Sequence, residues 1–117
     1  MDKIAIVGSR NWKDLLKIKN FIDTLDEETV VISGGAIGVD RRAEQLAKMR
    51  GLETKVFPAD WKRYGRSAGM RRNNDIVNKA DRIVAFWDGE SKGTYHTICL
   101  SAKTGKPLLI FLPKCWL

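Results

Sequence analysis

Hydrophobic and polar positions follow one repeating pattern along the chain, in which short apolar runs alternate with longer amphipathic segments. The apolar runs occupy residues 4–7, 30–32, 55–57, 83–87 and 108–112. They are rich in β-branched and aromatic residues and show little polar alternation, which is typical of strands that are covered on both faces of a sheet. The pattern therefore predicts five strands.

The segments between these runs have the spacing of helices that bury one face. One apolar stripe consists of Leu15, Ile18, Phe21, Ile22 and Leu25, and another consists of Val39, Ala43, Leu46 and Ala47. Two more helices are expected over residues 68–79 and 94–104, where Gly105 and Pro107 end the second one. Strands that alternate with helices indicate an α/β fold with a mostly parallel, doubly wound sheet between two helical layers. Because the chain has 117 residues, we expect one domain over 1–117.

The residues that follow each predicted strand are the informative ones for function, because open α/β sheets bind ligands beyond the carboxyl ends of their strands. Gly8, Ser9 and Arg10 follow the first strand, and residues 33–40 follow the second. The irregular stretch 58–67 follows the third strand, and residues 88–97 follow the fourth. Its length makes the stretch 58–67 a candidate functional loop rather than a simple connection.

The glycine-rich stretch SGGAIGVD, residues 33–40, has two interpretations. Gly34, Gly35 and Gly38 could let a phosphate or sugar approach the backbone at a helix start, or they could form a plain tight turn. The stretch matches neither the Walker A pattern nor the dinucleotide-binding G-x-G-x-x-G pattern. Asp40 could bind ribose hydroxyls or complement the first turn of the helix. Spacing alone leaves both interpretations open.

A second loop of the same kind, SKGTYHT, covers residues 91–97. Gly93 offers access to the backbone, Thr94 is a possible helix cap, and Thr97 adds a hydroxyl. Two arginines, Arg10 and Arg72, could supply bidentate phosphate contacts, although a surface turn and a solvated helix face would explain them equally.

Aromatic residues and the single histidine add candidates without deciding the chemistry. Trp61, Tyr64 and Trp87 could stack on a base or serve core and lid packing, and the position of Trp87 at the end of an apolar run favours packing. His96 has no legible Ser–His–Asp or Cys–His arrangement beside it. A structural role or a ligand contact is therefore the expected one.

Charge and cysteine content narrow the partners only slightly. A net charge of +7 favours phosphorylated or polyanionic partners, but the cations are scattered and often lie among acids. Cys99 and Cys115 have no metal-ligand spacing with each other or with His96, so we expect no metal site and no required cofactor.

The apolar run at the N-terminus leaves no room for a signal peptide, so a cytoplasmic location is expected. Trp12 and the apolar tail 115–117 suggest packing between subunits of a homo-oligomer.

Three blocks of sequence resemble a known family. SGGAIGVDRRAEQLA, VFPADWKRYGRSAGMRRN and VAFWDGESKGTYHTI are similar to the small YspA-type proteins of the SLOG superfamily, and the resemblance runs from about residue 3 to 112. That superfamily includes the LOG phosphoribohydrolases and DNA-processing protein A, which loads single-stranded DNA. The resemblance implies a Rossmann-like fold and a pocket for a nucleotide or an ADP-ribose-like ligand. With the loop residues above, the candidate ligand contacts are Gly8, Ser9, Arg10, Ser33, Gly34, Gly35, Ala36, Gly38, Val39, Asp40, Asp60, Trp61, Arg72, Asn73, Trp87, Asp88, Gly89, Ser91, Gly93, Thr94, His96 and Thr97.

One departure from the resemblance bears on catalysis. The phosphoribohydrolases carry PGGxGTxxE, whereas this chain has His96 and Thr97 where that acid would lie. We therefore favour a binding module that senses or sequesters a nucleotide-derived small molecule. The alternatives are a hydrolase of N-glycosidic or phosphate bonds, with Asp40, Asp60, Asp88 and His96 as candidate catalytic residues, and a protein that binds single-stranded nucleic acid.

Overall fold

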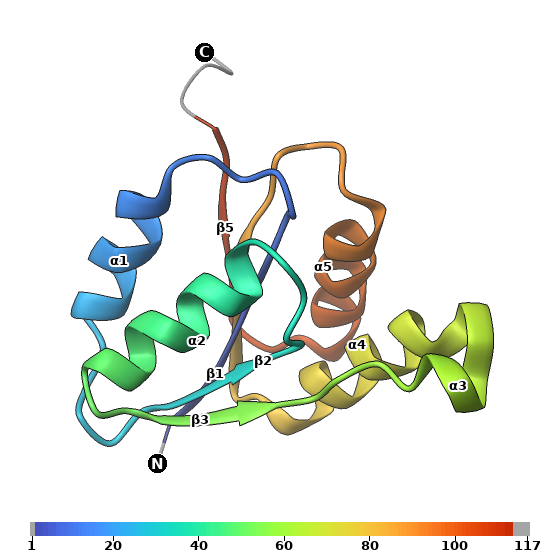
Figure 1. The fold of residues 1–117 in the computed structure, drawn as a ribbon, viewed down its shortest axis with the longest axis horizontal. Helices are drawn as coiled ribbons and strands as arrows, with labels where there is room; N and C mark the ends of the chain where they lie inside the picture. Colours follow the sequence, from blue (N-terminus) through green and yellow to red (C-terminus); the bar gives the residue numbers. More distant parts are fainter. Residues whose placement is uncertain (1, 114–117) are drawn as a thin grey trace.

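The computed structural model describes residues 2–113, which form a five-stranded sheet between helices (Figure 1). The strands are β1 (Lys3–Gly8), β2 (Val30–Ser33), β3 (Glu53–Val56), β4 (Arg82–Phe86) and β5 (Leu108–Phe111). Their order across the sheet is β3-β2-β1-β4-β5, and every neighbouring pair is parallel. The sequence prediction of a doubly wound, Rossmann-like α/β fold is confirmed.

Helices cover both faces of this sheet. They are α1 (Leu15–Asp23), α2 (Val39–Met49), α3 (Trp61–Tyr64), the 3-10 turn η1 (Gly65–Ser67), α4 (Ala68–Lys79) and α5 (Lys92–Thr104). Helices α1 and α2 pack side by side on one face, and α4 and α5 pack on the other (Figure 1). None of the helices described is long and apolar enough to cross a membrane.

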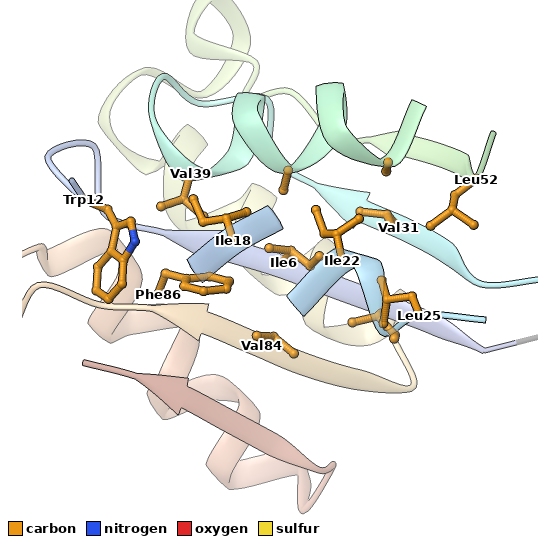
Figure 2. Close-up of a cluster of buried hydrophobic side chains, with 13 residues drawn as sticks. Ile6, Trp12, Ile18, Ile22, Leu25, Val31, Val39, Leu52, Val84 and Phe86 are labelled. Carbon is orange, nitrogen blue, oxygen red and sulfur yellow. The ribbon is translucent and has the colours of Figure 1, made fainter. Parts of the chain in front are cut away.

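The central strand β1 serves a hydrophobic core on each side of the sheet. Ile4 and Ile6 point into the cluster beneath α1 and α2, whereas Ala5 and Val7 point into the cluster beneath α4 and α5. All four are buried, as expected for a strand in the middle of a parallel sheet. Figure 2 shows the first cluster, in which side chains of α1 and α2 meet those of β1, β2 and β4.

Trp12 belongs to this core rather than to a subunit interface. Its side chain is 8% exposed, and its ring makes an edge-on contact with Phe86 at 5.5 Å between centroids (Figure 2). The indole Nε1–H donates to the carbonyl of Asp14 at 2.9 Å. The prediction that Trp12 packs between subunits is wrong, and the other element of that prediction, residues 115–117, lies outside the described residues.

The two outer strands are less covered than their apolar sequences predict. β3 is largely exposed and begins at Glu53, two residues before the predicted run, and Leu109 of β5 is 47% exposed. Only one side of an outer strand is paired, and the helices cover the middle of the sheet. The expectation of strands covered on both faces is therefore correct for β1, β2 and β4 but wrong at the edges.

Two local features at the carboxyl end of the sheet differ from the sequence prediction. The stretch 58–67 is mostly ordered as α3 and η1, which lie away from the sheet next to the beginning of α4 (Figure 1). Helix α5 begins at Lys92, two residues earlier than predicted, because the hydroxyl of Ser91 rather than Thr94 caps it. Its other end is as predicted, with Gly105 in the left-handed conformation at φ 72°.

Candidate functional site

A small cavity lies where the strand order reverses. The chain runs outward from β1 to β2 and β3 and then crosses to β4 on the other side of β1, so the ends of β1 and β4 flank the switch point at which such sheets bind ligands. The cavity has a volume of about 160 Å³. It is lined by Val7, Gly8, Arg10, Ala36, Ile37, Asp40, Arg72, Asn73, Ile76, Ser91, Gly93, Thr94 and Thr97.

A larger cavity adjoins it on the side of β3 and α3. Its volume is about 600 Å³, and its lining combines the β2–α2 loop with α2, α3 and the segment after β3. The residues are Arg10, Gly34, Gly35, Ala36, Ile37, Arg41, Glu44, Val56, Pro58, Ala59, Trp61 and Arg72. Arg10, Ala36, Ile37 and Arg72 line both cavities, so two arginines lie at their junction.

Asp40 is the buried acid of the small cavity. It is 5% exposed, and its Oδ2 accepts a hydrogen bond from the N–H of Gly34 at 3.0 Å. Burial raises the pKa of Asp40 from 3.8 to about 6, although the charge of Arg72 and the backbone N–H groups of Gly34, Ala36 and Gly8 act in the opposite direction. The carboxylate thus occupies the ring of N–H groups that a phosphate would take in a glycine-rich cradle. A group that titrates near pH 6 can also exchange a proton with a ligand near neutral pH.

The glycines around Asp40 make room for the protein's own atoms. A Cβ on Gly34 would collide with the guanidinium of Arg72, and a Cβ on Gly8 would lie 2.6 Å from Val39 Cγ2. Gly38 has φ 101°, and its Cβ would lie 2.7 Å from the carbonyl oxygen of Arg10. Gly35 has φ 70°, and its N–H donates to the hydroxyl of Ser33. Tight packing and turn geometry therefore account for this loop.

Gly93 is different, because it lines the small cavity and a Cβ added there would meet no other atom within 4 Å. It lies in the first turn of α5, where backbone N–H groups have no partner within the helix. Ser91 and Thr94 hydroxyls lie 3.0 Å apart beside it, and the Thr97 hydroxyl donates to the Gly93 carbonyl at 3.3 Å. Of the two glycine loops, the one at α5 has open space beside its glycine.

A chain of hydrogen bonds connects Arg72 to His96 through Asn73. Arg72 Nε donates to Asn73 Oδ1 at 3.0 Å, and Asn73 Nδ2 donates to the carbonyl of Gly93 at 3.4 Å. These two contacts fix the amide orientation, because a guanidinium only donates and a carbonyl only accepts. His96 Nδ1, 3.1 Å from Asn73 Nδ2, must therefore accept, which places the ring proton on Nε2. His96 lines neither cavity, and its hydrogen bond helps to fix the side chain of Asn73, which lines the small cavity.

Asp88 and Trp87 hold the loop that leads into α5. Asp88 Oδ1 accepts from the N–H groups of Glu90 and Ser91 at 2.8 and 2.9 Å. Burial acts to raise the pKa of Asp88, but these two N–H groups and the Ser9 hydroxyl outweigh it and lower the pKa. Trp87 donates from Nε1 to the carbonyl of Ser91 and stacks on Tyr95. Both side chains serve the loop, which favours the packing interpretation of Trp87.

Asp60 and Trp61 have separate tasks at the start of α3. Asp60 is the N-cap, and its Oδ1 accepts from the N–H of Arg63 at 3.1 Å. Trp61 lies over α4 at Gly69, where an added Cβ would be 3.4 Å from Trp61 Cη2. The indole remains 60% exposed and lines the large cavity. It is therefore available to a flat ligand.

The structure brings together many of the sequence-predicted contacts. Those that line a cavity are Gly8, Arg10, Gly34, Gly35, Ala36, Asp40, Trp61, Arg72, Asn73, Ser91, Gly93, Thr94 and Thr97. Those that line neither are Ser9, Ser33, Gly38, Val39, Asp60, Trp87, Asp88, Gly89 and His96. Of the four candidate catalytic residues, only Asp40 lines a cavity. Within residues 2–113 no cluster of three His, Cys, Asp or Glu side chains could hold a metal ion.

Sequence reasoning did not single out the remaining lining residues, which come from strands, helices and the loops within 33–40 and 58–67. These residues are Val7, Ile37, Arg41, Glu44, Val56, Pro58, Ala59 and Ile76. Arg41 and Glu44 lie one turn apart on α2, immediately after Asp40. Helical spacing from Asp40 is a sequence signal that would have found Glu44, four residues later, but not Arg41.

The family assignment follows from sequence comparison. Residues 2–64, more than half of the chain, match the profile of the YspA, cpYpsA-related SLOG family. The chain belongs to this family. A relative, the gene 61 protein of Mycobacterium phage D29, is 37% identical over 95% of this chain and 97% of its own length. The family resemblance seen in the three motif blocks is thus confirmed.

Two solved structures share the SLOG-type fold. DNA processing protein A (DprA) from Streptococcus pneumoniae matches with a TM-score of 0.82 and 20% identity, over 94% of this chain and 50% of that chain. DprA from Helicobacter pylori, solved to study its binding of single-stranded DNA, matches with a TM-score of 0.68 and 22% identity, over 97% of this chain and 66% of that chain. The present chain therefore spans about half to two thirds of these proteins, and at such identities the likeness shows the fold alone.

Proposed function

We propose that this SLOG protein binds a nucleotide or nucleotide-derived small molecule across the two cavities, as a sensor or sequestering module. The observation that carries the proposal is the pair of arginines that line both cavities, Arg10 from the loop after β1 and Arg72 from α4. Among residues 2–113 the ion pairs are Lys19–Asp23, Glu44–Lys48 and Asp2–Arg82, and none involves either arginine. Although the charge of Arg72 also acts on the buried carboxyl of Asp40, two arginines outside any ion pair suit a phosphate ligand.

Arg10 and Arg72 differ in how firmly they are held. Arg72 Nη1 donates to the carbonyl of Gly34 at 2.8 Å, so its fork is already fixed toward the cavities. Arg10 is exposed and can close on a ligand from the other side. A guanidinium that is already held by hydrogen bonds supports a phosphate site that costs little ordering on the Arg72 side.

The direct test measures binding by calorimetry with AMP, ADP and ADP-ribose, using Arg10→Ala against Lys13→Ala. Lys13 is a cation near the end of the same loop but lines neither cavity. Loss of a charge-assisted contact worth roughly 1.5–3 kcal/mol lowers affinity by about 10-fold or more in Arg10→Ala. Equal affinity of the two variants, or no binding of any nucleotide by the wild type, contradicts the proposal.

A second function, binding of single-stranded nucleic acid, is supported by the charge of the α3–α4 segment. Residues 61–74 carry Lys62, Arg63, Arg66, Arg71 and Arg72 and no acid. Arg63 and Arg71 lie against the ring of Tyr64, at 5.2 and 4.3 Å from its centroid. A cationic surface with aromatic side chains is suited to a nucleic-acid strand. The single-stranded DNA binding of Helicobacter pylori DprA points the same way.

Fluorescence anisotropy with labelled oligo-dT at several salt concentrations tests this second function. Binding driven by phosphate contacts falls steeply as salt rises, and Arg63→Ala combined with Arg66→Ala reduces the slope. Lys19→Ala with Lys48→Ala, on the opposite helical layer, is the matched control. No binding at low salt, or equal loss in both double variants, rejects nucleic-acid binding.

A further inference from the structure

Strand β5 forms one edge of the sheet, and its outer side pairs with no strand among residues 2–113. The stretch 107–113, PLLIFLP, contains no charged residue. Within it, Leu109, Ile110 and Leu112 are 47%, 38% and 39% exposed. Proteins usually protect a sheet edge with charged side chains, because its backbone groups can pair with another chain. This uncharged and partly exposed edge is therefore suited to pairing.

The opposite edge of the same sheet carries the usual protection. Strand β3 has the sequence ETKV, in which Glu53 and Lys55 place an exposed charge at every second position. If β5 paired with β3 of another copy, these charges would lie beside apolar side chains. Such head-to-tail pairing would also continue from copy to copy into an open filament. Charge matching therefore favours pairing of β5 with β5.

Hydrogen bonds to β4 show which backbone groups of β5 face outward. The carbonyls of Pro107 and Phe111 accept from N–H groups of β4 and the residue after it, both at 2.9 Å. Backbone groups of successive strand residues point to opposite sides of the strand. The residues whose N–H and C=O groups point away from β4 are therefore Leu108, Ile110 and Leu112.

This outward row is symmetric about Ile110. When two β5 strands pair antiparallel around a two-fold axis at this residue, Ile110 lies opposite Ile110 of the partner subunit. Leu108 then lies opposite the partner's Leu112, and Leu109 lies opposite the partner's Phe111. Every cross-strand pair is apolar, and the residues with outward backbone groups meet one another. The edge is thus complementary to itself.

The same register brings apolar side chains together on both faces of the sheet. Leu108 packs against the cluster beneath α4 and α5, and Phe111 packs against the cluster beneath α1 and α2. Because side chains alternate along a strand, Ile110 and Leu112 share the face of Leu108, whereas Leu109 shares the face of Phe111. Pairing therefore covers exposed apolar surface on each face.

From the uncharged edge, its symmetric register and its apolar pairs, we infer that the outer edge of β5 binds a second copy of this chain. The two β5 strands pair antiparallel around Ile110 and join two five-stranded sheets into one. The two-fold axis uses both β5 edges, so the assembly closes as a dimer. The interface is small, so the dimer dissociates on dilution. This assembly does not depend on the proposed ligand.

Sedimentation velocity with charged variants at position 110 tests the inference. The wild type should exchange between monomer and dimer over about a 100-fold range of concentration. Ile110→Lys and Ile110→Glu each place like charges opposite each other, and each should weaken the dimer by about 10-fold or more. A mixture of the two places Lys opposite Glu, so it should associate about 5-fold or more tightly than either variant alone. This rescue requires position 110 to face itself.

Val56→Lys and Leu16→Lys are the matched controls. Val56 lies on the other edge strand and is 37% exposed, and Leu16 is an exposed apolar residue of α1. Both variants should dimerise like the wild type. Equal weakening by either control places the interface elsewhere and overturns the inference. A wild type that stays monomeric, or a mixture without rescue, overturns it as well.

Hydrogen exchange of the wild type tests the backbone pairing without any substitution. The N–H groups of Ile110 and Leu112 point outward, so a higher protein concentration should slow their exchange. Thr54 is the control, because the next residue but two, Phe57, donates to β2, which leaves the Thr54 N–H facing outward on β3. Its exchange should not depend on concentration. Concentration-independent exchange at Ile110 and Leu112 contradicts the pairing, whether or not the variants fold.

Discussion

Arg72 Nη1 donates a hydrogen bond to the carbonyl oxygen of Gly34 at 2.8 Å, which ties α4 to the loop after β2 across 38 residues of sequence. The same guanidinium lowers the pKa of buried Asp40 against the effect of burial. One side chain therefore fixes the loop, stabilises the charged form of the acid and faces both cavities.

Replacement of Arg72 should affect both stability and the acid. Arg72→Ala removes the partner of a part-buried carbonyl, which costs roughly 1–3 kcal/mol in the free energy of unfolding. It also raises the pKa of Asp40 further, because the opposing positive charge is gone. Urea unfolding and an NMR titration of the Asp40 carboxyl measure the two effects. Arg72→Lys keeps the charge, so an Asp40 titration that shifts equally in both variants contradicts this account.

Asp40 should make the protein less stable as pH rises from about 4 to about 6. Its pKa is about 6 in the folded state and about 3.8 when exposed, so the native state binds more protons in this interval. At about 1.4 kcal/mol per pKa unit, the full cost above pH 6 is about 3 kcal/mol. In Asp40→Asn this contribution is absent. Urea unfolding from pH 4 to 7.5 checks it: a difference between wild type and variant that does not change with pH would refute the assignment.

Glycines of the two loops should differ in their tolerance of alanine. Gly38→Ala places a Cβ at φ 101° and 2.7 Å from the Arg10 carbonyl oxygen, so we expect a loss of at least 1–3 kcal/mol. Gly35→Val, at φ 70° and 2.9 Å from Val56 Cγ1, is strained as well and should also destabilise the fold. Gly93→Ala should be neutral or stabilising. Thermal unfolding of the three variants ranks them, and an equal loss for Gly38→Ala and Gly93→Ala speaks against this distinction.

Trp12 should contribute to folding without affecting assembly. Trp12→Ala empties space beside Phe86 in the core and lowers the free energy of unfolding by roughly 3–5 kcal/mol. The milder Trp12→Phe keeps the protein folded, and its sedimentation should equal that of the wild type, because a buried side chain does not reach a partner. A changed association state in Trp12→Phe would restore the interface role.

The fold was predictable because each of its signals is local. Buried central strands need unbroken apolar runs, and one-sided helices need a 3.6-residue stripe, so the order of elements is legible from residue types. Resemblance of three motif blocks then fixed the family. The exposure of the edge strands β3 and β5 was not predictable in this way, since an apolar run does not tell which strand has a neighbour on both sides. The early start of α5 was also missed, because Ser91 and Thr94 are equally suitable caps by residue type.

The position of the site was predictable for the same reason, since parallel strands bring all their carboxyl ends to one edge. The role of each residue at that edge was decided by the tertiary structure. Asp88 and Asp60 accept from N–H groups of their own loops, and His96 contacts Asn73 from an adjacent helix. A carboxylate or imidazole has the same letter in the sequence whether it faces a ligand or a backbone.

The loop SGGAIGVD marks the limit of what could be predicted from the sequence alone. Its residue types predicted a glycine-dependent connection between β2 and α2 but left open whether it is a phosphate cradle or a tight turn. Only the tertiary structure brought Arg72 against it from 38 residues further along the chain and turned Asp40, the last residue of the loop itself, back onto Gly34. Those contacts fill the loop with the protein's own groups and leave the open space at Gly93 on α5, where the packing of neighbouring elements rather than residue spacing sets the shape of the cavity.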